Sequence, residues 1–107
     1  MGPTNVAAIH CNVDVVHQNG FVQLRGRVVS AVEIDGNYRL DIRKDSRSGG
    51  ATNAIQAGEF HAKPNEPVFV GVSSFNTEAG MRLVAYFTVQ AGGESQSCST
   101  EREVSDE

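Results

Sequence analysis

The sequence predicts an all-β protein with an immunoglobulin-like antiparallel β-sandwich of about seven strands. In several segments apolar and polar residues alternate with a period of two, the pattern of a strand with one buried face. Turn signals rich in Gly, Asn and Asp separate these segments roughly every ten residues, as in sandwiches. At 107 residues the chain can enclose one hydrophobic core. We therefore expect residues 1–107 to form a single sandwich domain, with residues 1–5 and 104–107 flexible.

The first two strands are separated by a clear turn signal. The first is expected over about residues 6–16, where inward apolar residues alternate with polar ones. The Gln-Asn-Gly sequence at 18–20 is typical of a hairpin turn. The second strand is expected over about 21–32, and the Asp-Gly-Asn sequence at 35–37 predicts another turn.

Five further strands follow. The third is expected over about 38–44, where three apolar residues alternate with Arg39, Asp41 and Arg43. The polar, Gly-rich segment 45–53 is expected to be a mobile loop. The remaining strands are expected at about 55–62, 68–74 and 82–89, and from residue 94 through Cys98.

Alternation along these strands also predicts which side chains form the core. The inward residues are expected to be Ile9, Val13, Val15, Val22, Leu24, Val28, Tyr38, Leu40, Ile42, Phe60, Val68, Val70, Leu83 and Phe87.

Basic residues gather in one part of an acidic chain. Residues 25–47 carry six bases and four acids, whereas the rest of the chain has a net charge of −6. The six bases are Arg25, Arg27, Arg39, Arg43, Lys44 and Arg47. The four outward-facing Arg residues on the second and third strands predict an Arg-rich surface, which can steer an acidic polypeptide toward it. Ordinary solvated surface is the alternative. If the second and third strands belong to different sheets of the sandwich, the Arg residues form two patches and not one.

Composition and motifs argue against several functional classes. A pI near 5.3 and the absence of Trp are atypical of a nucleic-acid-binding domain. No apolar run is long enough to span a membrane. Nucleophile-elbow, phosphate-loop and metalloprotease motifs are missing, and the three His residues are scattered, so we expect no enzyme activity, no metal and no cofactor.

Two cysteines lie on strands that a sandwich can bring together. Cys11 lies on the inward face of the first strand and Cys98 near the middle of the last. A cross-link between them is compatible with this placement, and two buried reduced thiols are the alternative. Redox catalysis is disfavoured because the chain lacks a Cys-x-x-Cys motif.

Several stretches of the sequence carry a resemblance to a known family. They are Asn19-Gly20-Phe21-Val22, the Ser/Gly-rich segment from Arg43 to Gly50, and Pro64-Asn65-Glu66-Pro67-Val68 leading through Phe75-Asn76 to Arg82-Leu83-Val84. From about Ile9 to Thr100 the chain resembles the CsgC-like family of periplasmic curli-assembly proteins, most closely the branch called CsgH. CsgC has a Cys-x-Cys motif where this chain has Asp-Gly-Asn at 35–37, so no redox role is transferred.

The resemblance implies a chaperone-like inhibitor that keeps an unfolded curli amyloid subunit (CsgA-like) soluble through transient, charge-guided contacts. Arg25, Arg27, Arg39 and Arg43 are then the expected client-binding residues, with Lys44 and Arg47 extending their surface onto the following loop. The resemblance also implies a periplasmic monomer whose signal peptide has been removed. Because the periplasm is oxidising, it favours a disulfide between Cys11 and Cys98.

Two other functional classes stay open at this point. One is an immunoglobulin-like structural or adhesive module, which would bind one folded partner with defined stoichiometry. The other is a periplasmic redox or metal carrier that uses the cysteines or histidines.

Overall fold

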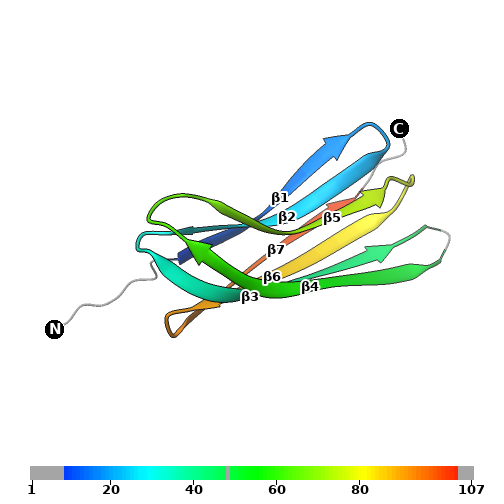
Figure 1. Cartoon of the computed structure of the whole chain (residues 1–107). Helices are drawn as coiled ribbons and strands as arrows, with labels where there is room; N and C mark the ends of the chain where they lie inside the picture. Colours follow the sequence, from blue (N-terminus) through cyan, green and yellow to red (C-terminus); the bar gives the residue numbers. More distant parts are fainter. Residues whose placement is uncertain (1–8, 48, 104–107) are drawn as a thin grey trace.

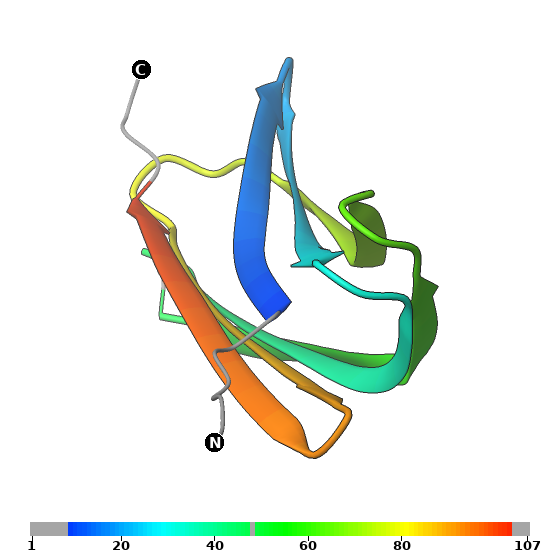
Figure 2. The same cartoon turned by 90° about the vertical axis from the view of Figure 1, so that its left-hand side faces the viewer.

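The computed structural model describes residues 9–47 and 49–103, and these residues form two stacked antiparallel sheets. The strands are β1 (Ile9–Gln18), β2 (Phe21–Ser30), β3 (Ile34–Asp45), β4 (Ala51–Ala62), β5 (Val68–Asn76), β6 (Arg82–Ala91) and β7 (Glu94–Glu103). One sheet has the order β1-β2-β5 and the other β4-β3-β6-β7 (Figure 1). Figure 2 shows the two sheets as separate layers. The all-β, seven-stranded sandwich is confirmed. The expected flexibility of residues 1–5 and 104–107 lies outside the described residues.

The core lies between the two sheets and follows the alternation of the sequence. Residues of the predicted core that are fully enclosed are Ile9, Val13, Val22, Leu24, Val28, Leu40, Ile42, Phe60, Leu83 and Phe87. Val15, Tyr38, Val68 and Val70 are partly buried and pack against them. The core also contains Ala62, Met81, Ala85, Val89 and Ala91, which the sequence prediction omitted. The predicted facing of every strand that contributed to the core is therefore confirmed.

One turn prediction was wrong, because strand pairing overrides local turn chemistry. The Asp-Gly-Asn sequence at 35–37 lies inside β3, where Gly36 pairs with Phe60 on β4 and with Ala91 on β6. A Cβ atom on Gly36 would lie 2.6 Å from the carbonyl oxygen of Gln90. Glycine here permits close packing of the neighbouring strand and does not form a turn.

The predicted loop at 45–53 is also shorter than expected. β3 runs to Asp45 and β4 begins at Ala51, and these two residues pair with each other. In the short connection the Ser46 amide donates to the Gly50 carbonyl oxygen at 2.8 Å, and Gly49 has a φ of 105°. The hairpin turn predicted at 18–20 is present, with Gly20 at φ 81°.

A bulge interrupts β5. Leu24 on β2 pairs with Ser73, whereas Gly26, two residues further along β2, pairs with Val70. Two residues of β5 therefore stand opposite one residue of β2, and Gly71 takes a φ of 66° that favours glycine. As a consequence, Val70 and Gly71 both face inward.

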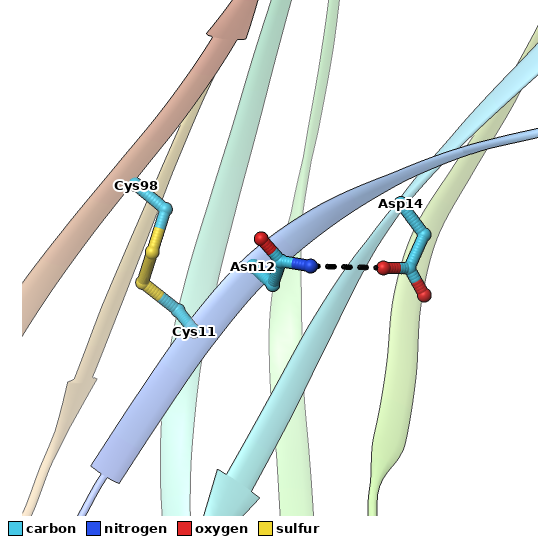
Figure 3. The surroundings of a disulfide bond; sticks show 4 residues. All are labelled: Cys11, Asn12, Asp14 and Cys98. Atoms are coloured by element: carbon cyan, nitrogen blue, oxygen red, sulfur yellow. Dashed lines mark hydrogen bonds between the residues drawn. A yellow bond between two sulfur atoms is a disulfide. The ribbon is translucent and has the colours of Figure 1, made fainter.

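The two long sides of the sandwich are closed by different contacts. On one side Cys11 of β1 and Cys98 of β7 form a disulfide, with 6.1 Å between their Cα atoms (Figure 3). The predicted cross-link is thus confirmed. On the other side the side-chain amide of Gln56 on β4 donates to the Val72 carbonyl oxygen at 2.8 Å and to the Ser73 hydroxyl at 2.9 Å.

Candidate binding surfaces

The structure separates the six basic residues of the 25–47 segment into three pairs. Arg25 and Arg27 lie on β2, and Arg39 and Arg43 lie on β3, each on the outward side of its strand. Because β2 and β3 belong to different stacked sheets, the two Arg pairs point to opposite sides of the sandwich. The Arg residues therefore form two surfaces, an arrangement that depends on tertiary structure and that alternation along the chain cannot reveal.

The first surface, which we name the three-strand face, consists of Asp14, Arg25, Arg27, Phe69 and Val72. Asp14 on β1 pairs with Arg25 across the β1–β2 ladder. Arg27 Nε donates to Asp14 Oδ1 at 3.3 Å, and Arg25 Nε lies 3.8 Å from Asp14 Oδ2. One carboxylate is thus shared by two guanidinium groups, which leaves one net positive charge among these three residues.

Apolar side chains complete the three-strand face. The Arg25 guanidinium carbon lies 4.1 Å from the centroid of the Phe69 ring, a cation–π contact that contributes roughly 0.5–1 kcal/mol at an exposed site. The bulge in β5 leaves both Phe69 and Val72 exposed on the outward side. Arg25 is therefore engaged by an acid and by an aromatic ring, so a ligand of Arg25 would have to displace existing contacts.

The second surface, which we name the four-strand face, consists of Arg39, Asp41, Arg43, Ile55 and Tyr86. Its Arg side chains are 60% and 55% exposed, compared with 35% and 38% for Arg25 and Arg27. Each pairs with an acid two residues further along β3: Arg39 with Asp41 at 3.7 Å, and Arg43 with Asp45 at 3.1 Å. Exposed pairs of this kind contribute about 0–1 kcal/mol, so these Arg residues can readily change partners.

Two large apolar residues flank the acid between these Arg residues. Asp41 pairs with Ile55 on β4 and with Tyr86 on β6, so the three side chains form one row across the sheet. Ile55 is 52% exposed and Tyr86 is 59% exposed. We did not predict either as a site residue. The signal was present, because an inward Phe60 requires an outward Ile55, and an inward Phe87 requires an outward Tyr86.

Lys44 and Arg47 lie at the end of the sandwich and contact the β5–β6 connection. Lys44 lies on the inward side of β3, and its side chain is only 16% exposed. Its Nζ lies 3.0 Å from Glu78 Oε2. This hydrogen bond lowers the pKa of Glu78 below its ordinary value. The stem of Arg47 packs against Gly80, where a Cβ atom would lie 2.8 Å from Arg47 Cδ. Lys44 therefore lies on the same side of β3 as Leu40 and Ile42 and not on the four-strand face, and Arg47 follows the end of β3.

A third polar cluster lies where β3 begins and β4 ends. His61 Nδ1 lies 2.5 Å from Asp35 Oδ1, and His61 Nε2 lies 2.7 Å from Glu33 Oε2. The hydrogen bond with Asp35, followed by that with Glu33, raises the pKa of His61 above its ordinary value of 6.5. Within residues 9–47 and 49–103, no group of three or more His, Cys, Asp or Glu side chains is arranged to hold a metal ion. The same residues contain no helix that is long and apolar enough to cross a membrane.

Two solved structures share most of this fold. The solution structure of R. palustris CsgH superposes with a TM-score of 0.75 at 26% sequence identity, covering 85% of this chain and 89% of that one. The E. coli curli protein CsgC superposes with a TM-score of 0.70 at 15% identity, covering 87% of this chain and 96% of that one. At this identity CsgC supports the fold alone.

A third structure is less similar to this chain, and the family is assigned from a sequence match. The sporulation control protein Spo0M of Bacillus subtilis superposes with a TM-score of 0.58 at 14% identity, covering 95% of this chain but 51% of its own. No significant match was found among curated protein sequences. The CsgH protein family model matches residues 10–101, which include all but the first residue of β1 and almost all of β7. Since this match spans most of the chain, the protein belongs to the CsgH family.

Proposed function

We propose that this protein is a non-enzymatic, chaperone-like inhibitor of curli-subunit amyloid formation in the periplasm. Its client is the unfolded curli subunit, which it contacts transiently through Arg25, Arg27, Arg39 and Arg43. Membership of the CsgH family supports involvement in the curli system, and the disulfide is compatible with an oxidising compartment. The observation that carries the proposal is the pair of exposed, weakly paired Arg residues beside Ile55 and Tyr86 on the four-strand face.

The chemistry of the four-strand face suits a transient contact with an unfolded acidic chain. Exposed charges raise the encounter rate of a ligand of opposite charge without requiring a fixed geometry. Ile55 and Tyr86 add apolar contact area to an extended segment after the encounter. Amyloid formation begins when unpaired strand segments stack, so a binder that meets these rare species can act at substoichiometric concentration.

A thioflavin lag-time series with the unfolded curli subunit tests the proposal. We expect wild type to lengthen the lag phase at substoichiometric concentration, and the variant with Arg25, Arg27, Arg39 and Arg43 changed to Gln to lose most of this effect. Because Arg39 and Arg43 are more exposed, the Arg39→Gln/Arg43→Gln variant should lose more than the Arg25→Gln/Arg27→Gln variant.

The matched control for the two double variants is Lys63→Gln/Arg102→Gln, which removes the same two positive charges from exposed residues outside both faces and should inhibit as wild type does. Inhibition should also fall as salt rises, because exposed charges are screened over about 8 Å at physiological ionic strength. If the four-Arg variant inhibits as well as wild type while circular dichroism shows both folded, the basic surfaces are not the working surfaces. If wild type does not delay fibrillation at all, the proposal gives way to the adhesive-module alternative.

A further inference from the structure

The sandwich has four edge strands, and three of them are guarded against pairing with another chain. β1 and β7 are joined by the disulfide, and both carry charged residues, among them Asp14 on β1 and Glu101 on β7. β5 is bent by the bulge at Gly71, and its Val72 carbonyl oxygen already accepts a hydrogen bond from Gln56. Bulges, charges and covering side chains are the means by which natural sheets protect their edges.

The fourth edge strand, β4, has none of these protections over most of its length. Its twelve residues pair with β3 in continuous register, so β4 contains no bulge. From Ala51 to Gly58 it carries eight residues without a charge or a proline. Outside the strand ladders, the backbone hydrogen bonds of the described residues join turns and connections and do not involve β4. Gln56 contacts β5 from the inward side of β4, and within the described residues no backbone-to-backbone hydrogen bond joins β4 to β5.

The charges beside this edge indicate what kind of strand would fit. On the outward side, Arg43 pairs with Asn53 and Arg39 with Ala57, so only small or short side chains separate each Arg from the edge. Neighbouring strands lie about 4.8 Å apart, so a strand added to β4 would run about 10 Å from β3. An Arg side chain and an acidic side chain on the added strand can together span this distance. The edge therefore complements a strand that is uncharged at its centre and acidic at two outward positions.

We infer that the free edge of β4 binds one extended segment of the amyloid subunit as an added strand. This inference rests on the proposed function and specifies how the client is bound. The segment would have about six to eight residues, no proline and no central charge, which is the composition of segments that nucleate amyloid. Backbone hydrogen bonds to Ala51–Gly58 supply the affinity, and Arg39 and Arg43 select acidic flanks. Strand addition removes the segment from nucleation by occupying one of its two edges.

Two matched Lys substitutions separate edge pairing from charge steering. Ile55→Lys places a positive charge in the middle of the β4 edge, where Lys opposes strand addition. Val32→Lys makes the same charge change at an aliphatic residue of equal exposure, 52% for both, in the β2–β3 connection and outside both faces. In the thioflavin assay with the unfolded curli subunit we expect Ile55→Lys to lose most of the lag extension and Val32→Lys to keep that of wild type. Ile55→Ser, which removes the same apolar side chain without adding a charge, should keep clearly more of the lag extension than Ile55→Lys. If charge alone matters, neither Lys variant loses inhibition, and if Ile55 acts only by apolar contact, Ile55→Ser loses as much as Ile55→Lys. Either result overturns the β4 inference while the proposed function stands.

A measurement on the wild-type protein keeps the inference testable should Ile55→Lys fail to fold. In a ¹H–¹⁵N spectrum with freshly diluted unfolded subunit, the amides of Ala51–Gly58 should broaden more than those of Val68–Asn76 on β5. Broadening confined to the three-strand face overturns the inference. The inference is also overturned if sedimentation without client shows a dimer that Ile55→Lys abolishes and Val32→Lys does not, because such a dimer would assign the edge to a second copy. A wild-type protein that does not delay fibrillation instead refutes the proposed function.

Discussion

The two long sides of the sandwich are closed by bonds of different kinds. Where β1 faces β7, a covalent bond joins Cys11 to Cys98. Where β4 faces β5, the closing contacts are two hydrogen bonds from the Gln56 amide. A disulfide restricts the unfolded chain and cannot open under oxidising conditions, whereas each hydrogen bond contributes about 1 kcal/mol and can break locally. The comparison teaches that the β4/β5 side can loosen locally, whereas a covalent bond holds the β1/β7 side.

Removing the disulfide should produce the largest loss of stability. The cross-linked residues are 87 positions apart, and in the chain-entropy model a closed loop of this length contributes about 4 kcal/mol. Cys11→Ala/Cys98→Ala should therefore lower the free energy of unfolding by about this amount in a urea titration. Mass spectrometry of the unreduced, alkylated wild-type protein should find no free thiol. A variant whose denaturation midpoint matches that of wild type would show that the β1/β7 side does not depend on its bond.

Leu40→Ala should cost about 2–5 kcal/mol, because the side chain is fully buried and packs beside Gly71 near the β4/β5 side. Arg39→Ala is the matched control, since Arg39 is the preceding residue and faces solvent. We expect its free energy of unfolding to lie within about 0.5 kcal/mol of that of wild type. Equal midpoints for the two variants would mean that the facing of β3 is wrong.

Gln56→Ala should lower the free energy of unfolding by about 1–2 kcal/mol and loosen the β4/β5 side only. Both hydrogen bonds that connect β4 to β5 are lost, so hydrogen exchange should accelerate in β5 and stay unchanged in β1. Gln23→Ala is the control, because it removes a longer hydrogen bond of 3.4 Å to Ser74 within the three-stranded sheet. Equal acceleration in β1 and β5 would contradict the independence of the two sides.

The smallest effect on stability is expected at the cluster of Glu33, Asp35 and His61, which lies at the end of β4. The carboxylates of Asp35 and Glu33 raise the pKa of His61, so the stabilisation from this cluster is full below pH 6.5 and is lost as the pH rises through the raised pKa. Asp35→Asn should lower the pKa of His61 more than Glu33→Gln, because the Asp35 hydrogen bond is the larger cause. Titration of the His61 ring protons by NMR measures both shifts. A larger shift in Glu33→Gln would reverse the order of the two contacts.

Alternation in the sequence predicted the facing of strands, because one buried face imposes a period of two. It placed Leu83 and Phe87 in the core although Val84 and Tyr86 beside them are almost as apolar, and the structure confirms this choice. Alternation also predicts the exposed Ile55 and Tyr86. Family resemblance then favoured the disulfide over two free thiols.

Features that depend on contacts between strands could not be predicted in this way. The bulge at Gly71 places Val70 and Gly71 on the same side and leaves Phe69 beneath Arg25. A glycine inside a strand pattern is a local signal for a bulge, but it does not reveal which residues of the partner strand stand opposite it. Gly36 resembles a turn residue but serves the close approach of β6. The separation of Arg25 and Arg27 from Arg39 and Arg43 follows from the assignment of β2 and β3 to different sheets.

Because the edge strands are unevenly protected, the molecule offers one edge to which another strand can pair. Polymers that grow by strand addition need two unpaired edges on every subunit, because each added subunit must present an edge to which the next one can pair. Among the described edge strands that pair in regular register, β4 has the longest stretch free of charge and proline, eight residues compared with six at 95–100 on β7. β7 is cross-linked to β1, and β5 is bent by its bulge. A copy of this protein at the end of a growing stack is therefore a terminator and not a link.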